Sequence, residues 1–294
     1  MKTPAALPER ASRPALRVHT LGRVEVLVDG HPTAWHAQTA EELFFYLLSY
    51  PEGRSKDEIL EVLWGLDPNP AANNRFRVTL HRVRAALGYP EAILEDHHSY
   101  RLAPEVLEAS DLYGFYRDIA EARRAGGQGE RLKAYRRAIR AYSGDYLPRL
   151  ATNWVGQARE EHRAAYVRAL LEVALVHLGQ RDWHPAADFL RRAVYADPYI
   201  GENYHQQLMG CLSLLGDRYA AIEHYRRFVK FLRDELGDTP MPETHELAER
   251  IKAGEPVCPW GVSGAPSSTE RPSKPTSGVR PRAFSLSRAA ANRG

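Results

Sequence analysis

A spacing pattern that occurs twice near the C-terminal end of the chain is the feature that most limits the possible folds. Each copy follows a turn that contains glycine, and places small, aliphatic or aromatic residues at helical intervals. The first copy contains Ala186, Leu190 and Ala193, and the second, thirty-five positions later, contains Ala221, Tyr225 and Phe228. A period of this length is typical of helical repeats, which bury their apolar faces only by stacking on one another. We therefore expect stacked helix pairs in this region.

Helical spacing extends from residue 111 to residue 254, which predicts an all-α domain of the tetratricopeptide type. A further, degenerate copy of the pattern is expected to begin with Leu132, Tyr135, Ala138 and Ile139. The second full copy is imperfect, because Phe228 stands where such repeats prefer alanine. Stacked helix pairs offer a concave surface, usually to protein partners. Most aromatic residues of this region are expected to be core residues.

The segment from residue 73 to residue 87 predicts an amphipathic helix with an unusual outer face. Its apolar residues recur at intervals of four, three and four, and form one stripe of Phe76, Leu80, Val83 and Leu87. At about 100° per residue, the opposite stripe carries Asn74, Val78, His81 and Arg82, and the flanks carry Arg75, Arg77 and Arg84. No acidic residue interrupts residues 69–89. Such a helix can enter the major groove of DNA, where Arg bonds guanine and Asn bonds adenine, or it is a solvated surface helix.

The residues before this helix predict a small sheet and two further helices. Alternating apolar residues predict strands at 16–21 and 24–28 with a hairpin turn at Asp29-Gly30, and residues 32–35 predict a third strand. A capping-box spacing at Thr39 predicts the start of a helix whose inner stripe is Ala40, Phe44, Leu47 and Leu48. A second capping box at Ser55 predicts a helix whose inner residues are Ile59, Leu60, Leu63 and Trp64.

The third helix has its own start and stop signals, with Asn69 as the cap, Pro70 at the first helical position and Gly88 after the last. A hairpin is predicted next, from strands at 92–94 and 100–102 joined by residues 95–99. Together these elements predict a winged helix-turn-helix domain at residues 16–104, with the third helix as the reader. The predicted fold class is thus mainly α with a small β part, in which this domain precedes the tetratricopeptide-like repeat domain at residues 111–254.

Charge is a poor guide to the partner of this chain. The formal net charge is +3, but residues 1–103 contain 12 Lys and Arg against 13 Asp and Glu. An inference of nucleic-acid binding therefore depends on the local clustering of arginine in one helix and not on overall basicity.

The remaining composition predicts a cytoplasmic protein that does not enter a membrane. No apolar run of the length of a bilayer span occurs, and the first fifteen residues lack the apolar segment of a signal peptide. Cys211 and Cys258 have no CxxC partner, which argues against a disulfide framework or a zinc site. Residues 1–15 and 255–294 are expected to be disordered; the latter are rich in Pro, Ser, Gly and Arg and poor in aliphatic residues.

Motifs of catalysis and cofactor binding are missing from the sequence. Neither a phosphate-binding Gly-x-x-x-x-Gly-Lys loop nor a Gly-x-Gly-x-x-Gly turn occurs, and the helix segment from His245 to Glu249 lacks the second histidine of a zinc protease motif. The acidic residues before His162 and the pair His97-His98 are better explained by a surface charge run and a wing tip. We expect no enzyme activity, no metal and no cofactor.

The ordered set of motifs resembles the Streptomyces antibiotic regulatory protein (SARP) class of transcription activators. This class joins an OmpR-type winged helix to a bacterial transcriptional activation domain. The resemblance covers about residues 16–252 and depends on Leu21-Gly22 and Asp29-Gly30, on residues 55–64 and 73–87, and on Tyr142 to Pro148, Ala196 to Pro198, Glu235 to Gly237 and Pro242 to Thr244.

This resemblance implies binding to double-stranded DNA at tandem promoter repeats, by a homodimer or by tandem protomers, and recruitment of RNA polymerase through the loop at residues 65–72. The residues implied to face the groove are Asn74, Arg75, Arg77, Val78, His81 and Arg82. The resemblance implies an approach to phosphates for Ser55, Lys56 and Trp64, and a place near the minor groove for His97, His98 and Arg101. Arg84, on the flank of the arginine helix, is also predicted to bind DNA. The wing departs from the family pattern, because Ser99 stands where a glycine is usual.

A second hypothesis is a helical-repeat interaction adaptor whose winged helix binds protein and does not read DNA. The near-neutral charge of residues 1–103 is compatible with it. The arginine helix argues against it, because a protein-binding helix more often presents aromatic or aliphatic anchors.

Overall fold

The computed structural model describes residues 13–258, and their contacts divide them into two compact units. One unit combines residues 13–116 with residues 143–158, and the other combines residues 117–142 with residues 159–258. Most of the two ends expected to be disordered lie outside the described residues. Ala15 is an exception, since its N–H donates to the Asp29 carboxylate at 2.8 Å.

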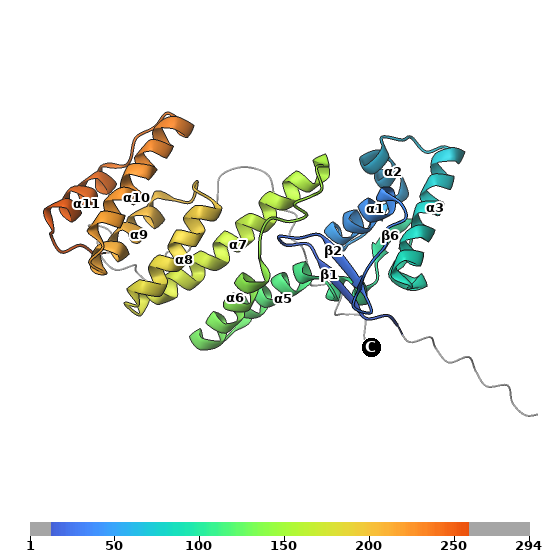
Figure 1. The fold of residues 1–294 in the computed structure, drawn as a ribbon, viewed down its shortest axis with the longest axis horizontal. Helices are drawn as coiled ribbons and strands as arrows, with labels where there is room; N and C mark the ends of the chain where they lie inside the picture. Colours follow the sequence, from blue (N-terminus) through green and yellow to red (C-terminus); the bar gives the residue numbers. More distant parts are fainter. Residues whose placement is uncertain (1–12, 259–294) are drawn as a thin grey trace, which may run out of the picture. The chain divides into compact units, whose positions relative to one another are not determined.

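The N-terminal unit begins with a three-stranded antiparallel sheet (Figure 1). Its strands are β1 (Leu16–His19), β2 (Glu25–Val28) and β3 (His31–Pro32), in sequence order. Asp29 and Gly30 form the predicted hairpin turn with φ angles of 50° and 82°, as a type I′ turn requires. The third strand ends at Pro32 and not at residue 35 as predicted, because the Trp35 ring turns onto Phe44, with centroids 5.5 Å apart.

Three helices follow, α1 (Gln38–Ser49), α2 (Lys56–Trp64) and α3 (Pro70–Leu87). The predicted capping box at Thr39 is wrong, because the cap of α1 is Ala37, two residues earlier, and it makes no side-chain hydrogen bond. The capping box at Ser55 and the cap at Asn69 are confirmed. Helix α1 is buried on more than one side, at Ala40, Leu43, Phe44, Phe45, Tyr46, Leu47 and Leu48.

A second small sheet completes the winged helix. It contains β4 (Arg54–Ser55), β5 (Ile93–Asp96) and β6 (Ser99–Leu102), with β6 in the middle. A short 3-10 turn, η1 (Pro90–Ala92), leads from α3 into the predicted hairpin, and α4 (Pro104–Glu108) follows it. The hairpin turn is tighter than predicted, since only His97 and His98, with φ angles of 46° and 65°, join the strands. Strand β4 was not predicted, because two residues are too few to show an alternating pattern.

The expectation of continuous helix from residue 111 to residue 254 is wrong for residues 143–152. This segment is not helical and packs against the first sheet of the N-terminal unit, where Tyr146 forms an isolated bridge with Leu21. The buried Tyr146 hydroxyl also shares a 2.7 Å hydrogen bond with the Ser49 hydroxyl. Gly22 permits this approach: a Cβ atom there would lie 2.9 Å from the backbone of Gly144.

The remaining chain is helical. Its elements are α5 (Asp111–Arg124), α6 (Gln128–Ala141), α7 (Asn153–Gly179), α8 (Trp183–Ala196), α9 (Glu202–Leu214), α10 (Arg218–Phe231), the π-turn η2 (Leu232–Leu236) and α11 (Pro242–Ala253). The repeat is confirmed, since α8 and α10 bury Ala186 and Ala221 at equivalent positions. Helix α9 packs between them (Figure 1). Phe228 occupies the position at which such repeats prefer alanine. Its ring stacks on the His205 ring, with centroids 4.0 Å apart.

No helix within residues 13–258 combines the length and the hydrophobicity that a membrane span requires.

Candidate nucleic-acid interface

Helix α3 has one buried stripe and one exposed stripe, in the rotation that the sequence predicted. The buried residues include Phe76, Leu80, Val83 and Leu87. The Phe76 ring meets the Tyr100 ring edge-on, with centroids 4.8 Å apart, which fixes α3 against the β5–β6 hairpin. The exposed residues are Asn74, Arg75, Arg77, Val78, His81 and Arg82. The structure thus brings all six predicted groove-facing residues onto one accessible surface.

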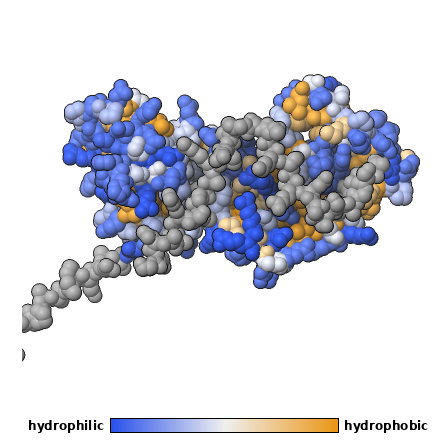
Figure 2. Space-filling model, turned by 180° about the vertical axis from the view of Figure 1, so that it is seen from behind, coloured by the Kyte–Doolittle hydropathy of each residue, from blue (hydrophilic) through white to orange (hydrophobic). Residues whose placement is uncertain are grey.

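Within residues 13–258, the exposed arginines of α3 are not neutralised by carboxylates. Within the described residues, no carboxylate lies at ion-pair distance from Arg75, Arg77 or Arg82. Helix α3 itself contains no acidic residue. The face of the N-terminal unit drawn in Figure 2 is mostly hydrophilic, with few hydrophobic residues. Three unpaired guanidinium groups on one helix attract a polyanion over the distance of a Debye length.

Trp64, at the end of α2, holds one of these arginines in place. The guanidinium carbon of Arg75 lies 4.7 Å from the centroid of the Trp64 ring, in a cation–π contact. The indole nitrogen of Trp64 is buried and has no hydrogen-bond partner within the described residues. Trp64 is therefore a support for Arg75 in this structure, whereas the resemblance implied a contact of its own with phosphate.

Arg84 is separated from the exposed set. Its guanidinium donates a 2.8 Å hydrogen bond to the Ile93 carbonyl oxygen at the start of β5, and the side chain is half-buried. Periodicity placed Arg84 on the flank of α3 but gave no information about the strand beside it. In this structure Arg84 connects α3 to the hairpin through this hydrogen bond.

The start of α2 presents Ser55 and Lys56 to solvent in part. The Ser55 hydroxyl oxygen accepts from the Glu58 N–H at 3.2 Å, and the Ser55 N–H donates to the Glu58 carboxylate at 2.9 Å. Because the hydroxyl acts here as an acceptor, its own proton remains able to donate. Lys56 is the first helical residue and is partly exposed.

The wing carries a mixed set of charges. His97 and His98 form its exposed tip, and Arg101 is half-buried on β6, on the opposite side of the strand from the buried Tyr100. The Tyr100 hydroxyl donates to the Glu95 carboxylate at 2.9 Å. Burial and the neighbouring Glu95 raise the pKa of Tyr100 to about 12, so this donor stays protonated at neutral pH. The hydrogen bond from the buried Tyr100 thus fixes the position of the Glu95 carboxylate.

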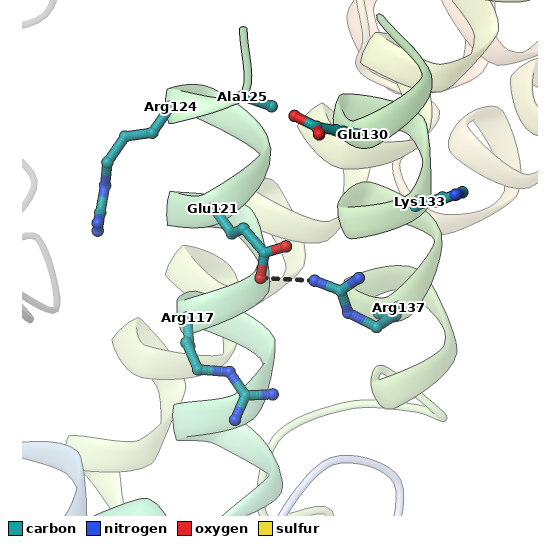
Figure 3. A pocket seen from close by; sticks show the side chains of 7 residues that line it. All are labelled: Arg117, Glu121, Arg124, Ala125, Glu130, Lys133 and Arg137. Atoms are coloured by element: carbon teal, nitrogen blue, oxygen red, sulfur yellow. Dashed lines mark ion pairs between the residues drawn. The ribbon is translucent and has the colours of Figure 1, made fainter. Parts of the chain in front are cut away.

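A charged pocket of the C-terminal unit lies between α5 and α6 (Figure 3). Arg137 pairs there with Glu121 at 2.6 Å and with the buried Asp118 at 3.5 Å. Figure 3 shows Arg124 and Lys133 pointing away from this pair. Since the cations do not converge on one point, the pocket is not built as an anion site. Within residues 13–258, no group of three or more His, Cys, Asp or Glu side chains could hold a metal ion.

Comparison with known proteins relates this chain, a winged helix followed in the sequence by stacked helix pairs, to bacterial regulatory proteins. Residues 111–252 match the family model of the bacterial transcriptional activator domain. The chain is 28% identical over 249 residues to the regulatory protein AfsR of Streptomyces coelicolor, a match that covers 83% of this chain and 25% of the relative. AfsR of Streptomyces griseus is 28% identical over 259 residues, with 82% and 25% covered. The chain therefore spans about a quarter of the length of these relatives.

A solved structure has the same fold. EmbR of Mycobacterium tuberculosis, determined in complex with a low-affinity phosphopeptide, matches with a TM-score of 0.67 and 22% sequence identity. The match covers 84% of this chain and 67% of EmbR. Together, these matches confirm the resemblance to SARP-type transcriptional activators and the predicted fold class.

Proposed function

We propose that the chain is a sequence-specific DNA-binding activator that reads promoter repeats with α3 of a domain at residues 16–104. The observation that carries this proposal is the exposed stripe of α3, in which Arg75, Arg77 and Arg82 are accessible and have no carboxylate partner among the described residues. Arg and Asn are the side chains that read guanine and adenine in the major groove. The competing adaptor function receives less support, since the exposed stripe contains no aromatic anchor.

We further propose that RNA polymerase contacts residues 65–72, which comprise the loop between α2 and α3 and the first turn of α3. This segment begins at Gly65, which has a φ of 59°, and its residues from Asp67 to Ala71 are exposed. The helical domain at residues 111–254 then acts through protein contacts and places two protomers side by side on DNA. Repeats about one helical turn apart, roughly 10–11 bp, would present both copies on one face of the duplex.

The proposal predicts strongly salt-dependent binding of the full chain to its best site, selected from a random DNA library. Each phosphate neutralised contributes about −0.9 to the slope of log K against log salt concentration. Changing Arg75, Arg77 and Arg82 together to Gln should make this slope less negative. The matched control changes Arg226, an exposed arginine of α10, to Gln and should leave the slope unchanged. Salt-independent or undetectable association of the full chain would contradict the proposal.

Single substitutions should separate base reading from backbone contact. Arg82→Ala is expected to lower affinity for the selected site by about 1–3 kcal/mol and to relax the preference at one base pair, as loss of one bidentate base contact does. Lys56→Ala is expected to weaken selected and random sequences equally, because a phosphate contact carries no sequence information. Equal losses on both kinds of DNA for Arg82→Ala would mean that Arg82 only positions the protein. The measurement is a titration of both DNAs by fluorescence anisotropy.

A further inference from the structure

The exposed stripe of α3 contains one aliphatic side chain larger than alanine. Val78 is 38% exposed, and its neighbours on this stripe are polar or charged. A lone exposed aliphatic residue on a protein surface is common and needs no special explanation. What gives Val78 significance is its place within a surface otherwise made of hydrogen-bonding side chains.

Val78 lies at the centre of this stripe along the helix axis. It follows Asn74 by one turn and precedes His81 and Arg82 by one turn. When a helix lies in a groove, the centre of its outward stripe is nearest to the base edges, and long flanking side chains reach the phosphates. Because valine is branched at Cβ, it holds essentially one rotamer in a helix. The two methyl groups of Val78 therefore have a nearly fixed position relative to the helix.

The chemistry of valine limits what it can recognise in a groove. It neither donates nor accepts a hydrogen bond, and the C5-methyl of thymine is the apolar group on the major-groove edge of the base pairs. Placed against a polar edge of another base, valine would desolvate that edge without replacing its hydrogen bonds. We propose that Val78 packs on the C5-methyl of a thymine, so the operator contains a thymine that faces the middle of α3. This inference rests on the proposed DNA-binding function.

The proposed contact with a thymine methyl can be tested by removing one methyl group of the DNA at a time, with the full chain as the protein. In the DNA site selected for the wild-type protein, each thymine is replaced in turn by deoxyuridine, which differs only by lacking this methyl. We expect one replacement to weaken wild-type binding about three- to fivefold, as loss of one buried methyl group predicts. The remaining replacements should change affinity little. Wild-type protein that binds every deoxyuridine site as tightly as the parent site would overturn the inference.

The same DNA series with a variant assigns the effect to Val78. Val78→Ala should lose the preference for thymine over deoxyuridine at that position, so the two changes are not additive in a double-mutant cycle. The control is Val62→Ala, which truncates an exposed valine of α2 and should keep the preference. If Val78→Ala keeps it as well, another side chain reads the methyl and the inference is wrong. Failure of the wild-type protein to bind any selected DNA would instead contradict the proposed function.

Discussion

Phe76→Ala is expected to destabilise the N-terminal unit strongly. The Phe76 side chain is 1% exposed and packs edge-on against Tyr100, so its truncation leaves a cavity between α3 and the hairpin. Phe→Ala substitutions in cores lower the free energy of unfolding by about 3–5 kcal/mol. The total free energy of unfolding of a natural domain is about 5–15 kcal/mol. Chemical denaturation followed by circular dichroism measures the loss.

His81→Ala is the matched control for this experiment. His81 lies on the same helix but on its exposed stripe, where substitutions usually change stability by about 0.5 kcal/mol or less. The Phe76 variant should therefore show a much lower unfolding midpoint than the His81 variant. Equal midpoints for the Phe76 variant and the wild-type protein would mean that the stripe assigned to the core does not stabilise it.

The second large effect is expected for Asp111→Ala. The Asp111 carboxylate accepts hydrogen bonds from the N–H of Thr20 at 2.9 Å, from the Thr20 hydroxyl at 2.7 Å and from the N–H of Leu21 at 3.2 Å. Thr20 is fully buried, so these donors lose a partner at a largely buried position when the carboxylate is removed. Each buried donor left unsatisfied lowers stability by about 1–3 kcal/mol. Thermal denaturation should show a melting temperature well below that of the wild-type protein.

Two further variants define the cause of this loss. Asp111→Asn keeps one acceptor oxygen and should be less destabilising than Asp111→Ala. Asp188→Ala, at an exposed position of α8, removes a carboxylate with the same charge and should leave the melting temperature nearly unchanged. If Asp111→Ala and Asp188→Ala melt alike, the contacts of Asp111 with the first sheet do not stabilise the unit.

Most helices and the rotation of α3 could be predicted because their signals are local. Phe76, Leu80 and Val83 repeat at helical intervals, and the caps at Ser55 and Asn69 lie within three residues of the N–H groups that they satisfy. Thr39 shows the limit of such signals. Its spacing to Glu42 matches a capping box, but the cap of α1 is Ala37, two residues before Thr39, and Thr39 lies within the first turn.

The unpredicted features depend on residues far apart in the sequence. Arg84 belongs to the exposed flank of an isolated helix, and only the position of Ile93 explains its hydrogen bond. In the same way, Tyr146 lies in a region of helical composition, but its hydroxyl partner is Ser49, almost a hundred residues earlier. No periodicity within residues 143–152 encodes that pairing.

Two contacts between α3 and the β5–β6 hairpin have a thermodynamic consequence. One is the hydrogen bond from Arg84 to Ile93, and the other is the ring contact between Phe76 and Tyr100. Because both connect the helix to the strands through buried or half-buried groups, helix and hairpin are ordered before any ligand arrives. Association then loses little backbone entropy in this part of the molecule, and the entropy loss is confined to long exposed side chains such as Arg77 and Arg82.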